Sequence, residues 1–256
     1  MKLKLLVWFF LLSPLCALAE ESPASNTIGV GGWLRPTYDG GDSQKIVAIP
    51  VADYQHNQFF ITTSQGIFEA GIKTTKLYGF SVGLQLANES GRDSSESAWL
   101  SSKNATSLPA SVSWGGQVEF SNSIGPMPFW ILARYRQNTD ASFGAQEDLR
   151  VSAGVYGGER LQAGIFAQAT WADNNSIQRY YGISTQEAVI TGLAVFTPTA
   201  GKLYNSAGIL WQYDLSHTWK LVGSIEAHYL QAAALNSPLV TTNVNDYASL
   251  GIVYAF

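Results

Sequence analysis

Apolar and polar residues alternate with a period of two along much of the chain, and the pattern is clearest at its end. One face of residues 246–256 carries Phe256, Tyr254, Ile252, Leu250 and Ala248, while the other carries Ala255, Val253, Gly251 and Ser249. A strand of about ten residues with one apolar face and one small or polar face is the unit of a β-barrel that crosses a membrane. The pattern therefore predicts a membrane-spanning strand here.

The same alternation recurs along the chain, bounded by Gly, Asn, Asp, Ser or Pro. It predicts twelve strands, at 27–38, 45–54, 57–64, 66–73, 77–88, 111–121, 127–137, 147–157, 160–171, 204–215, 218–231 and 246–256. The third and fourth are short, with only Gln65 between them, so ten strands is the alternative count. We expect an all-β fold, namely an antiparallel transmembrane β-barrel.

The connections between these strands alternate between short and long. Barrels of the bacterial outer membrane place both termini and short turns in the periplasm and longer loops outside the cell. If the first strand runs outward, the long connections 89–110, 138–146, 172–203 and 232–245 all lie outside. Only the one at Gln65 fits an outer loop poorly, so the lengths favour twelve strands with short periplasmic turns.

Aromatic residues at the predicted strand ends favour the same arrangement, because membrane barrels carry aromatic girdles at both interfaces of the lipid. The lipid-facing set at the periplasmic ends is Tyr54, Tyr78, Phe120, Phe129, Tyr213, Trp219 and Phe256, and at the outer ends it is Tyr38, Tyr135, Trp171 and Tyr229. We expect contact with outer-membrane lipid. We also expect Tyr254 and Phe256 to be the signal that the barrel assembly machinery reads.

The opposite face of the strands collects charged residues of both signs. We expect them in the lumen: Arg35, Asp53, Glu69, Lys73, Glu119, Arg134, Arg136, Asp148, Arg150, Glu226 and His228. An unpaired buried charge costs several kcal/mol. Two arrangements therefore remain open, a salt-bridged interior and a wet conduction path.

The composition agrees with a barrel in which only one face of each strand is apolar. Charged residues make up 13% of the chain and aromatic residues 12%, and the net charge of −4 does not suggest nucleic acid as a partner. Residues 1–19 are predicted to be a cleaved signal peptide, with Lys2 and Lys4 before an apolar stretch and Ala17-Leu18-Ala19 as the cleavage site. The domain is then 20–256, which contains no cysteine.

Candidate catalytic chemistry is weak. Ser224, Glu226 and His228 share one strand face. Successive residues on one face of a strand are about 7 Å apart, whereas a nucleophile and its base need hydrogen-bond contact. The glycines at 29, 31 and 32 lie within a strand and are not followed by a helix, so they are no nucleotide loop. We expect no enzyme, cofactor or metal site.

The long connection 172–203 contains one helical signal. Ser184-Thr185-Gln186-Glu187 is a capping box, which predicts a short helix. Because so short a helix is unstable alone in water, we expect Val189 and Ile190 to be buried against the barrel. We further expect Asp173 and Arg179 to reach luminal charges such as Arg134 and Glu226, and the loop to narrow the pore. The alternative is a loop that packs on the rim and leaves the lumen open.

The same region carries a resemblance to a known family. The segment Thr170-Trp171-Ala172-Asp173, followed by Tyr180-Tyr181-Gly182-Ile183-Ser184, resembles a signature of the MltA-interacting protein (MipA)/OmpV family. Asn236-Ser237-Pro238-Leu239-Val240 resembles the family's stretch before the last strand. Ile177 replaces a family tyrosine, and the Ser-rich stretch 88–107 looks like an insertion.

The resemblance implies an outer-membrane barrel of a Gram-negative bacterium. It implies a scaffolding role that links a lytic murein transglycosylase to a murein synthase, and it carries no enzymatic residues. A small-solute porin-like channel and a surface adhesin are the alternatives. The short periplasmic turns weaken the scaffold interpretation, while stretch 89–110 could serve an adhesin.

Overall fold

Twelve antiparallel strands close into a barrel in which each strand pairs with its neighbours in the chain and β12 pairs with β1. The structure, a computed structural model, describes residues 26–63 and 67–256, so the predicted signal peptide at 1–19 lies outside the described residues. The strands are β1 Thr27–Pro36, β2 Gln44–His56, β3 Phe59–Thr62, β4 Glu69–Lys73, β5 Phe80–Glu89, β6 Ser111–Ile124, β7 Met127–Asn138, β8 Ala145–Gly157, β9 Leu161–Ala172, β10 Gly201–Asp214, β11 Trp219–Leu230 and β12 Val244–Ala255. The predicted antiparallel barrel of twelve strands is confirmed.

Short helices lie in the connections. They are η1 Ser94–Glu96, α1 Ala98–Ser102, η2 Ala141–Phe143, α2 Asn174–Tyr181, α3 Thr185–Thr191 and α4 Ala232–Leu235. In the described part of the chain, no helix has the length and apolar character needed to cross a membrane.

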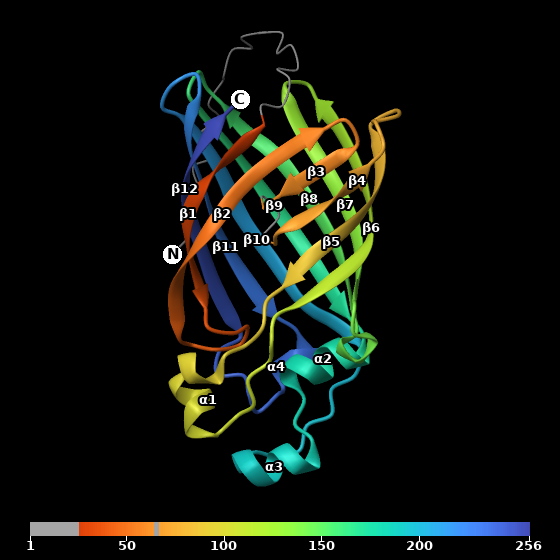
Figure 1. Cartoon of the computed structure of the whole chain (residues 1–256), viewed down its shortest axis with the longest axis vertical. Coiled ribbons are helices and arrows are strands. Elements are labelled where there is room, and N and C mark those ends of the chain that lie inside the picture. The colour runs from red at the N-terminus through yellow and green to blue at the C-terminus, as the bar shows by residue number, and fades with distance from the viewer. Residues whose placement is uncertain (1–25, 64–66) are drawn as a thin grey trace, which may run out of the picture.

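The two ends of the barrel differ in their connections. Helices α1 to α4 gather at one end, and the carboxy terminus lies at the other (Figure 1). We call the first the loop end; its connections include 37–43, 90–110, 139–144, 173–200 and 231–243. The other is the turn end, with connections 57–58, 74–79, 125–126, 158–160 and 215–218. The predicted alternation of long and short connections is therefore present.

Alternation along each strand separates an outward row from an inward row. In β5 the outward Phe80, Val82 and Leu84 are exposed, whereas the inward Ser81 and Gln85 are buried. Such a wall is the reverse of a soluble protein, whose exposed row is polar. It suits a barrel with lipid outside and packed polar side chains inside.

Glycine permits close pairing where the barrel closes. Gly29 of β1 lies opposite Val253 of β12. A Cβ atom on Gly29 would lie 2.0 Å from the carbonyl oxygen of Ile252, a distance that no side chain tolerates. The glycine in the first strand therefore lets the first and last strands approach.

Several predicted strand ends were wrong. The first strand ends at Pro36, and Tyr38 lies buried in the following loop instead of facing lipid. The fifth begins at Phe80 instead of residue 77, because Tyr78 and Gly79 have positive φ and form a tight turn closed by a bridge between Leu77 and Phe80. The third and fourth are only four and five residues long.

Candidate functional site in the barrel lumen

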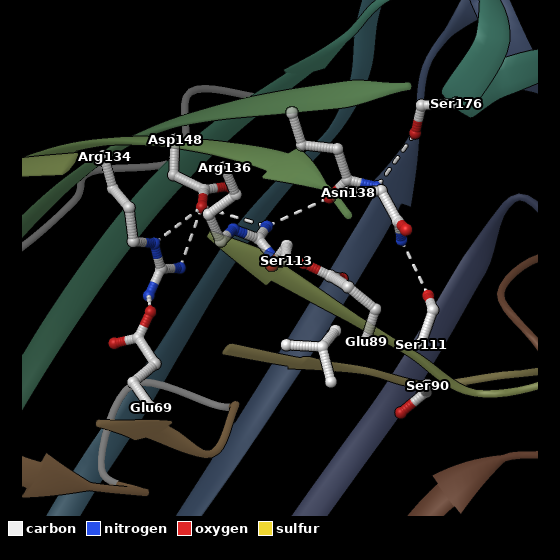
Figure 2. A network of polar contacts seen from close by, with 12 residues as sticks. Glu69, Glu89, Ser90, Ser111, Ser113, Arg134, Arg136, Asn138, Asp148 and Ser176 are labelled. Atoms are coloured by element: carbon white, nitrogen blue, oxygen red, sulfur yellow. Dashed lines mark hydrogen bonds and ion pairs between the residues drawn. The ribbon is translucent and has the colours of Figure 1, made fainter. Parts of the chain in front are cut away.

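A buried ion-pair network crosses one side of the lumen (Figure 2). The Arg134 guanidinium lies 2.6 Å from a Glu69 carboxylate oxygen and 2.8 Å from one of Asp148. Arg136, two residues further along the same face of β7, lies 3.1 Å from Asp148 and 2.5 Å from Glu89. All but Glu89 are almost fully buried. Because unpaired buried charges are costly, these groups stabilise one another as a unit.

One contact of this network joins strands that are paired in the sheet, and another joins strands that are not adjacent. Arg134 and Asp148 lie directly opposite each other on the paired strands β7 and β8. Glu69, however, is on β4, which is separated from β7 by β5 and β6. The Arg134–Glu69 contact therefore runs across the interior of the barrel. The Thr170 hydroxyl of β9 donates a hydrogen bond of 2.7 Å to Asp148, which extends the network to a further strand.

Aromatic rings form the opposite side of the lumen. The His228 ring of β11 lies between Tyr204 of β10 and Tyr247 of β12, with centroids 4.5 and 4.3 Å away. Tyr247 in turn stacks on Trp33 of β1 at 5.8 Å. We call these four residues the aromatic wall. Its stacking geometry is favourable for aromatic pairs, and it presents flat ring surfaces to the interior.

A cavity of about 160 Å³ lies between the ion-pair network and the aromatic wall. Its lining includes Arg134, Arg136 and Arg150 from β7 and β8, and Tyr204, Glu226, His228 and Tyr247 from the opposite strands. Arg150 stacks over the Phe166 ring at 3.7 Å. Glu226 contacts the imidazole of His228 at 2.9 Å. This cavity is the candidate functional site.

The remaining predicted luminal charges lie elsewhere. Arg35 is at the loop-end edge of the cavity, where its side chain donates to Ser90 at 3.0 Å and stacks on Trp33 at 4.9 Å. Asp53 interacts electrostatically with Lys73 and with Glu119, and none of the three lines the cavity. Asp53 is exposed, whereas the network residues are buried. The lumen is thus packed in its middle and more accessible near the turn end.

Four loops close over the loop end of the cavity. We call connections 37–43, 90–110, 173–200 and 231–243 the loop cap. The Tyr38 hydroxyl donates to the Leu239 carbonyl at 2.8 Å, and Arg92 donates to the Tyr180 carbonyl at 2.6 Å. The Ser237 hydroxyl donates to the Tyr181 carbonyl at 2.6 Å. Each bond joins two different loops, so the four form one unit.

Two apolar clusters fill the loop cap. One contains Ala172, Ile177, Tyr181, Leu203, Leu230 and Ala234, and the other contains Tyr38, Leu100, Ala105, Ile183 and Leu239. Leu100, Ile177 and Ile183 are among the most buried side chains of the described residues. Burial of a large aliphatic side chain is worth roughly 1.5–3 kcal/mol. The clusters therefore give the cap a hydrophobic core separate from the polar lumen.

Burial also shifts two ionisable groups of the cap. Desolvation raises the pKa of the Tyr181 phenol well above 10.0. Desolvation also lowers the pKa of the Arg92 guanidinium, and nearby tyrosines partly offset this. Tyr181 and Arg92 both line the cavity, so the cap supplies part of the site.

The residues of the family-like segments lie at the joints of the cap. Asp173 caps α2 by accepting from the Ser176 amide at 2.8 Å, and Ser184 caps α3 in the predicted capping box. Gly182 ends α2, where a Cβ atom would lie 1.9 Å from the Gln178 side chain. Ser237 joins α4 to α2, and Pro238 follows it. Trp171, at the end of β9, lies under the Lys202 ammonium at 5.4 Å.

Three expectations for connection 172–203 were wrong. Val189 is 83% exposed and Ile190 is also exposed, because α3 packs through Ala188 instead. Asp173 is used as a helix cap. Arg179 donates its side-chain hydrogen bonds to the Ser111 hydroxyl and the Pro109 carbonyl instead of to luminal charges. The contact with the cavity is made by Tyr180 and Tyr181 of α2.

Several residues of the site are not predicted from the sequence. Trp33, Tyr204 and Tyr247 occupy inward positions that follow from the alternation, whereas the girdle pattern places aromatic residues on the lipid face. Glu89 and Arg92 fell at a strand end and in a loop, where alternation gives no signal.

The Ser224–Glu226–His228 stack does not form a catalytic contact. The Ser224 hydroxyl shares a hydrogen bond of 2.7 Å with Ser249, while His228 contacts Glu226. Among the described residues no group of three or more His, Cys, Asp or Glu is arranged to hold a metal ion.

Comparison with known proteins identifies the family. A family model described as MltA-interacting protein MipA matches residues 28–256. The NanC porin structure is 10% identical, with a TM-score of 0.50 over 90% of this chain and 100% of that chain. An outer membrane channel from Pseudomonas putida F1 is 10% identical, with a TM-score of 0.44 over 96% and 100% of the two chains. No curated protein sequence matches. The NanC porin likeness shows the fold alone. The chain belongs to the MltA-interacting protein MipA family.

Proposed function

We propose that this protein is a structural barrel of the outer membrane that holds a murein-associated partner at its periplasmic end. The observation that carries the proposal is the closed lumen. The buried contact between Arg134 and Glu69 fills one side of it, and the loop cap covers one end. An open porin needs a continuous wet path, whereas a structural barrel gains stability from a packed interior.

The turn end offers the surface that such a partner would contact. In outer-membrane barrels the short turns face the periplasm, so the turn end is assigned there. Tyr78 is 90% exposed in the turn between β4 and β5, and Ile124 is 72% exposed at the tip of the β6–β7 hairpin. The Ser121 amide of β6 donates to the Gly79 carbonyl at 2.8 Å, which joins the turn between β4 and β5 to the strand that leads into the hairpin. Leu77 and Met127 are exposed in the same region. We call these four apolar residues the turn-end patch.

The family description names the class of partner. An MltA-interacting protein binds a lytic murein transglycosylase, and the family's scaffold role also involves a murein synthase. A periplasmic enzyme of this kind would meet the barrel at the turn end. An exposed apolar patch marks a contact with protein or with membrane, and the turn-end patch is our candidate for the protein contact.

A small-solute channel is the second candidate, and the cavity of about 160 Å³ favours it. The cavity is small and partly enclosed by α2, so only a narrow or gated path is consistent with it. A surface adhesin has less support, because stretch 90–110 buries Leu100 within the loop cap instead of extending from it.

Crosslinking in intact envelopes tests the scaffold proposal. A photoreactive amino acid is placed at Tyr78 or Ile124 of the turn-end patch. The matched control positions are Val189 and Val195, which are exposed apolar residues of the loop end. The proposal predicts that a murein transglycosylase is captured from the turn-end positions only. Capture from the loop-end positions alone, or of no murein enzyme from either end, would contradict it.

A further inference from the structure

Several buried arginines line the cavity in the lumen, together with the carboxylates of Asp39, Glu89 and Glu226. Among the ion pairs of the described residues, none involves Arg92 or Arg150, although both line the cavity and are about 95% buried. Among the described residues, the Arg92 guanidinium donates to the carbonyls of Tyr180 and Thr106. Arg150 donates one long hydrogen bond, of 3.4 Å, to the Gln168 side chain. A buried guanidinium without an anion in contact is costly, and Arg150 has only the electrostatic attraction of Glu226 and Asp148, which lie beyond ion-pair distance.

Two arginine N–H groups without hydrogen-bond partners also indicate a ligand in the cavity. The Nε atoms of Arg92 and Arg136 are buried and have no hydrogen-bond partner. Buried donors without partners are rare, and each calls for an explanation. Two such donors on residues that line one cavity are explained if a ligand with acceptor oxygens occupies it.

The aromatic side of the cavity favours a ligand with a planar, apolar ring. The aromatic wall of Trp33, Tyr204, His228 and Tyr247 offers ring faces. Flat rings stack favourably on such surfaces. A ligand that spans the cavity would therefore place an anionic group toward the arginines and a planar apolar body against the wall.

The volume limits the size of the ligand. A cavity of about 150 Å³ engineered in another protein binds benzene, and this one is about 160 Å³. We infer that the lumen binds a small organic anion, of the class of ring-bearing monocarboxylates, between the aromatic wall and the arginines of the cavity. Guanidinium groups recognise carboxylates through paired, charge-assisted hydrogen bonds. The site does not depend on the murein partner.

Calorimetric titration of the folded barrel in detergent tests this inference. Benzoate is the probe, and benzamide is its uncharged match of nearly equal size and shape. Acetate carries the charge without the ring. We expect benzoate to bind at least about tenfold more tightly than benzamide or acetate, since a charge-assisted pair to a buried arginine is lost in benzamide and the ring contact in acetate. Equal binding of benzoate and benzamide, or no benzoate binding at all, would overturn the inference.

A charge-removing variant assigns the site. Arg150→Met removes the charge but keeps an unbranched, flexible side chain, and we expect it to weaken benzoate binding at least about tenfold while leaving benzamide binding unchanged. Lys220→Met is the matched control, since it also removes a cation but lies near the turn end beside Asp214 and outside the cavity. Unchanged benzoate affinity in Arg150→Met, or an equal loss in Lys220→Met, would contradict the assignment. The wild-type comparison of the three probes does not depend on how either variant folds.

Discussion

Arg134 of β7 and Glu69 of β4 meet across the barrel interior at 2.6 Å, with two intervening strands between their own and almost no exposed surface on either side chain. Glu69 receives a further hydrogen bond from the Gln85 side chain at 3.1 Å. The pair connects two parts of the wall that backbone pairing leaves apart. The short strands β3 and β4 make few ladder bonds, so this side-chain contact contributes to holding them in place.

Removing Glu69 should therefore weaken the barrel. Glu69→Ala leaves Arg134 buried with one fewer carboxylate, and breaking a buried pair in this way costs about 3–5 kcal/mol. We expect a clear drop in the urea midpoint of unfolding in detergent. The control is Lys45→Ala, which breaks a partly exposed pair with Glu96 and should cost less than about 1 kcal/mol. Equal stability of the two variants would contradict the structural role of the pair.

The loop cap should open locally when its joint at Ser237 is removed. The Ser237 hydroxyl donates to the Tyr181 carbonyl and accepts from the Leu239 amide at 3.2 Å. Ser237→Ala leaves a buried carbonyl without its partner, at about 1–3 kcal/mol. Hydrogen exchange should become faster in 173–182 and stay unchanged in the strands of the turn end. Ser95→Ala, in an exposed turn, is the control; unchanged protection in Ser237→Ala would argue against the joint.

High pH should open the loop cap. Burial raises the pKa of Tyr181 well above 10.0, and it raises that of Tyr38 as well. A phenol with a higher pKa in the folded state holds its proton more tightly there. Its stabilisation is therefore complete below pH 10 and is lost as the pH rises above 10. Hydrogen exchange in α2 should accelerate above about pH 10, the ordinary tyrosine value, by more than the base-catalysed increase that every amide shows.

Two tyrosine variants test whether ionisation of Tyr181 causes the opening at high pH. Tyr181→Phe removes the ionisable group and should move the opening to higher pH. Tyr78→Phe changes a tyrosine that is 90% exposed and should have no effect. If Tyr181 ionises together with exposed tyrosines, as followed by absorbance at 295 nm, the buried environment assigned to it is wrong.

The last residue should matter for assembly. Phe256 is exposed at the turn end, where its ring stacks near Tyr54 at 6.2 Å and Tyr254 at 6.4 Å. Phe256→Asp places a charge among these rings, and we expect less folded, heat-modifiable barrel in the outer membrane. Phe256→Tyr keeps the ring and should behave as wild type. Wild-type amounts of the Asp variant would show that the assembly signal does not depend on this residue.

Strand alternation predicted the barrel because each residue of the wall faces either lipid or lumen. Apolar and polar residues therefore alternate along each strand with a period of two. The alternation missed the turn at Tyr78 and Gly79, where two positive φ angles end a pattern that continues in the sequence. The prediction that aromatic residues face lipid was incomplete for a different reason. Aromatic side chains occur both at the lipid interface and in stacks inside the barrel, and only the strand periodicity distinguishes the two locations for residues such as Trp33 and Tyr247.

Contacts within the site were less predictable. The spacing of Arg134 and Arg136 placed them on one strand face, but nothing in the sequence showed that Glu69 lies within reach across the interior. The helix after Ser184 was predicted by its capping box, yet its packing face was not. A capping box determines where a helix starts, whereas burial depends on the neighbours that distant loops supply.

Conductance in planar lipid bilayers is the most direct test of whether the barrel is closed. A lumen crossed by buried ion pairs and covered by the loop cap should conduct poorly. Replacing 174–200 with a short Gly-Ser bridge removes α2 with Tyr180 and Tyr181, and should produce a larger and steadier conductance. Replacing α3 alone should change little, because its Val189 and Ile190 are exposed. A large wild-type conductance, equal to that of the deletion, would contradict the closed barrel.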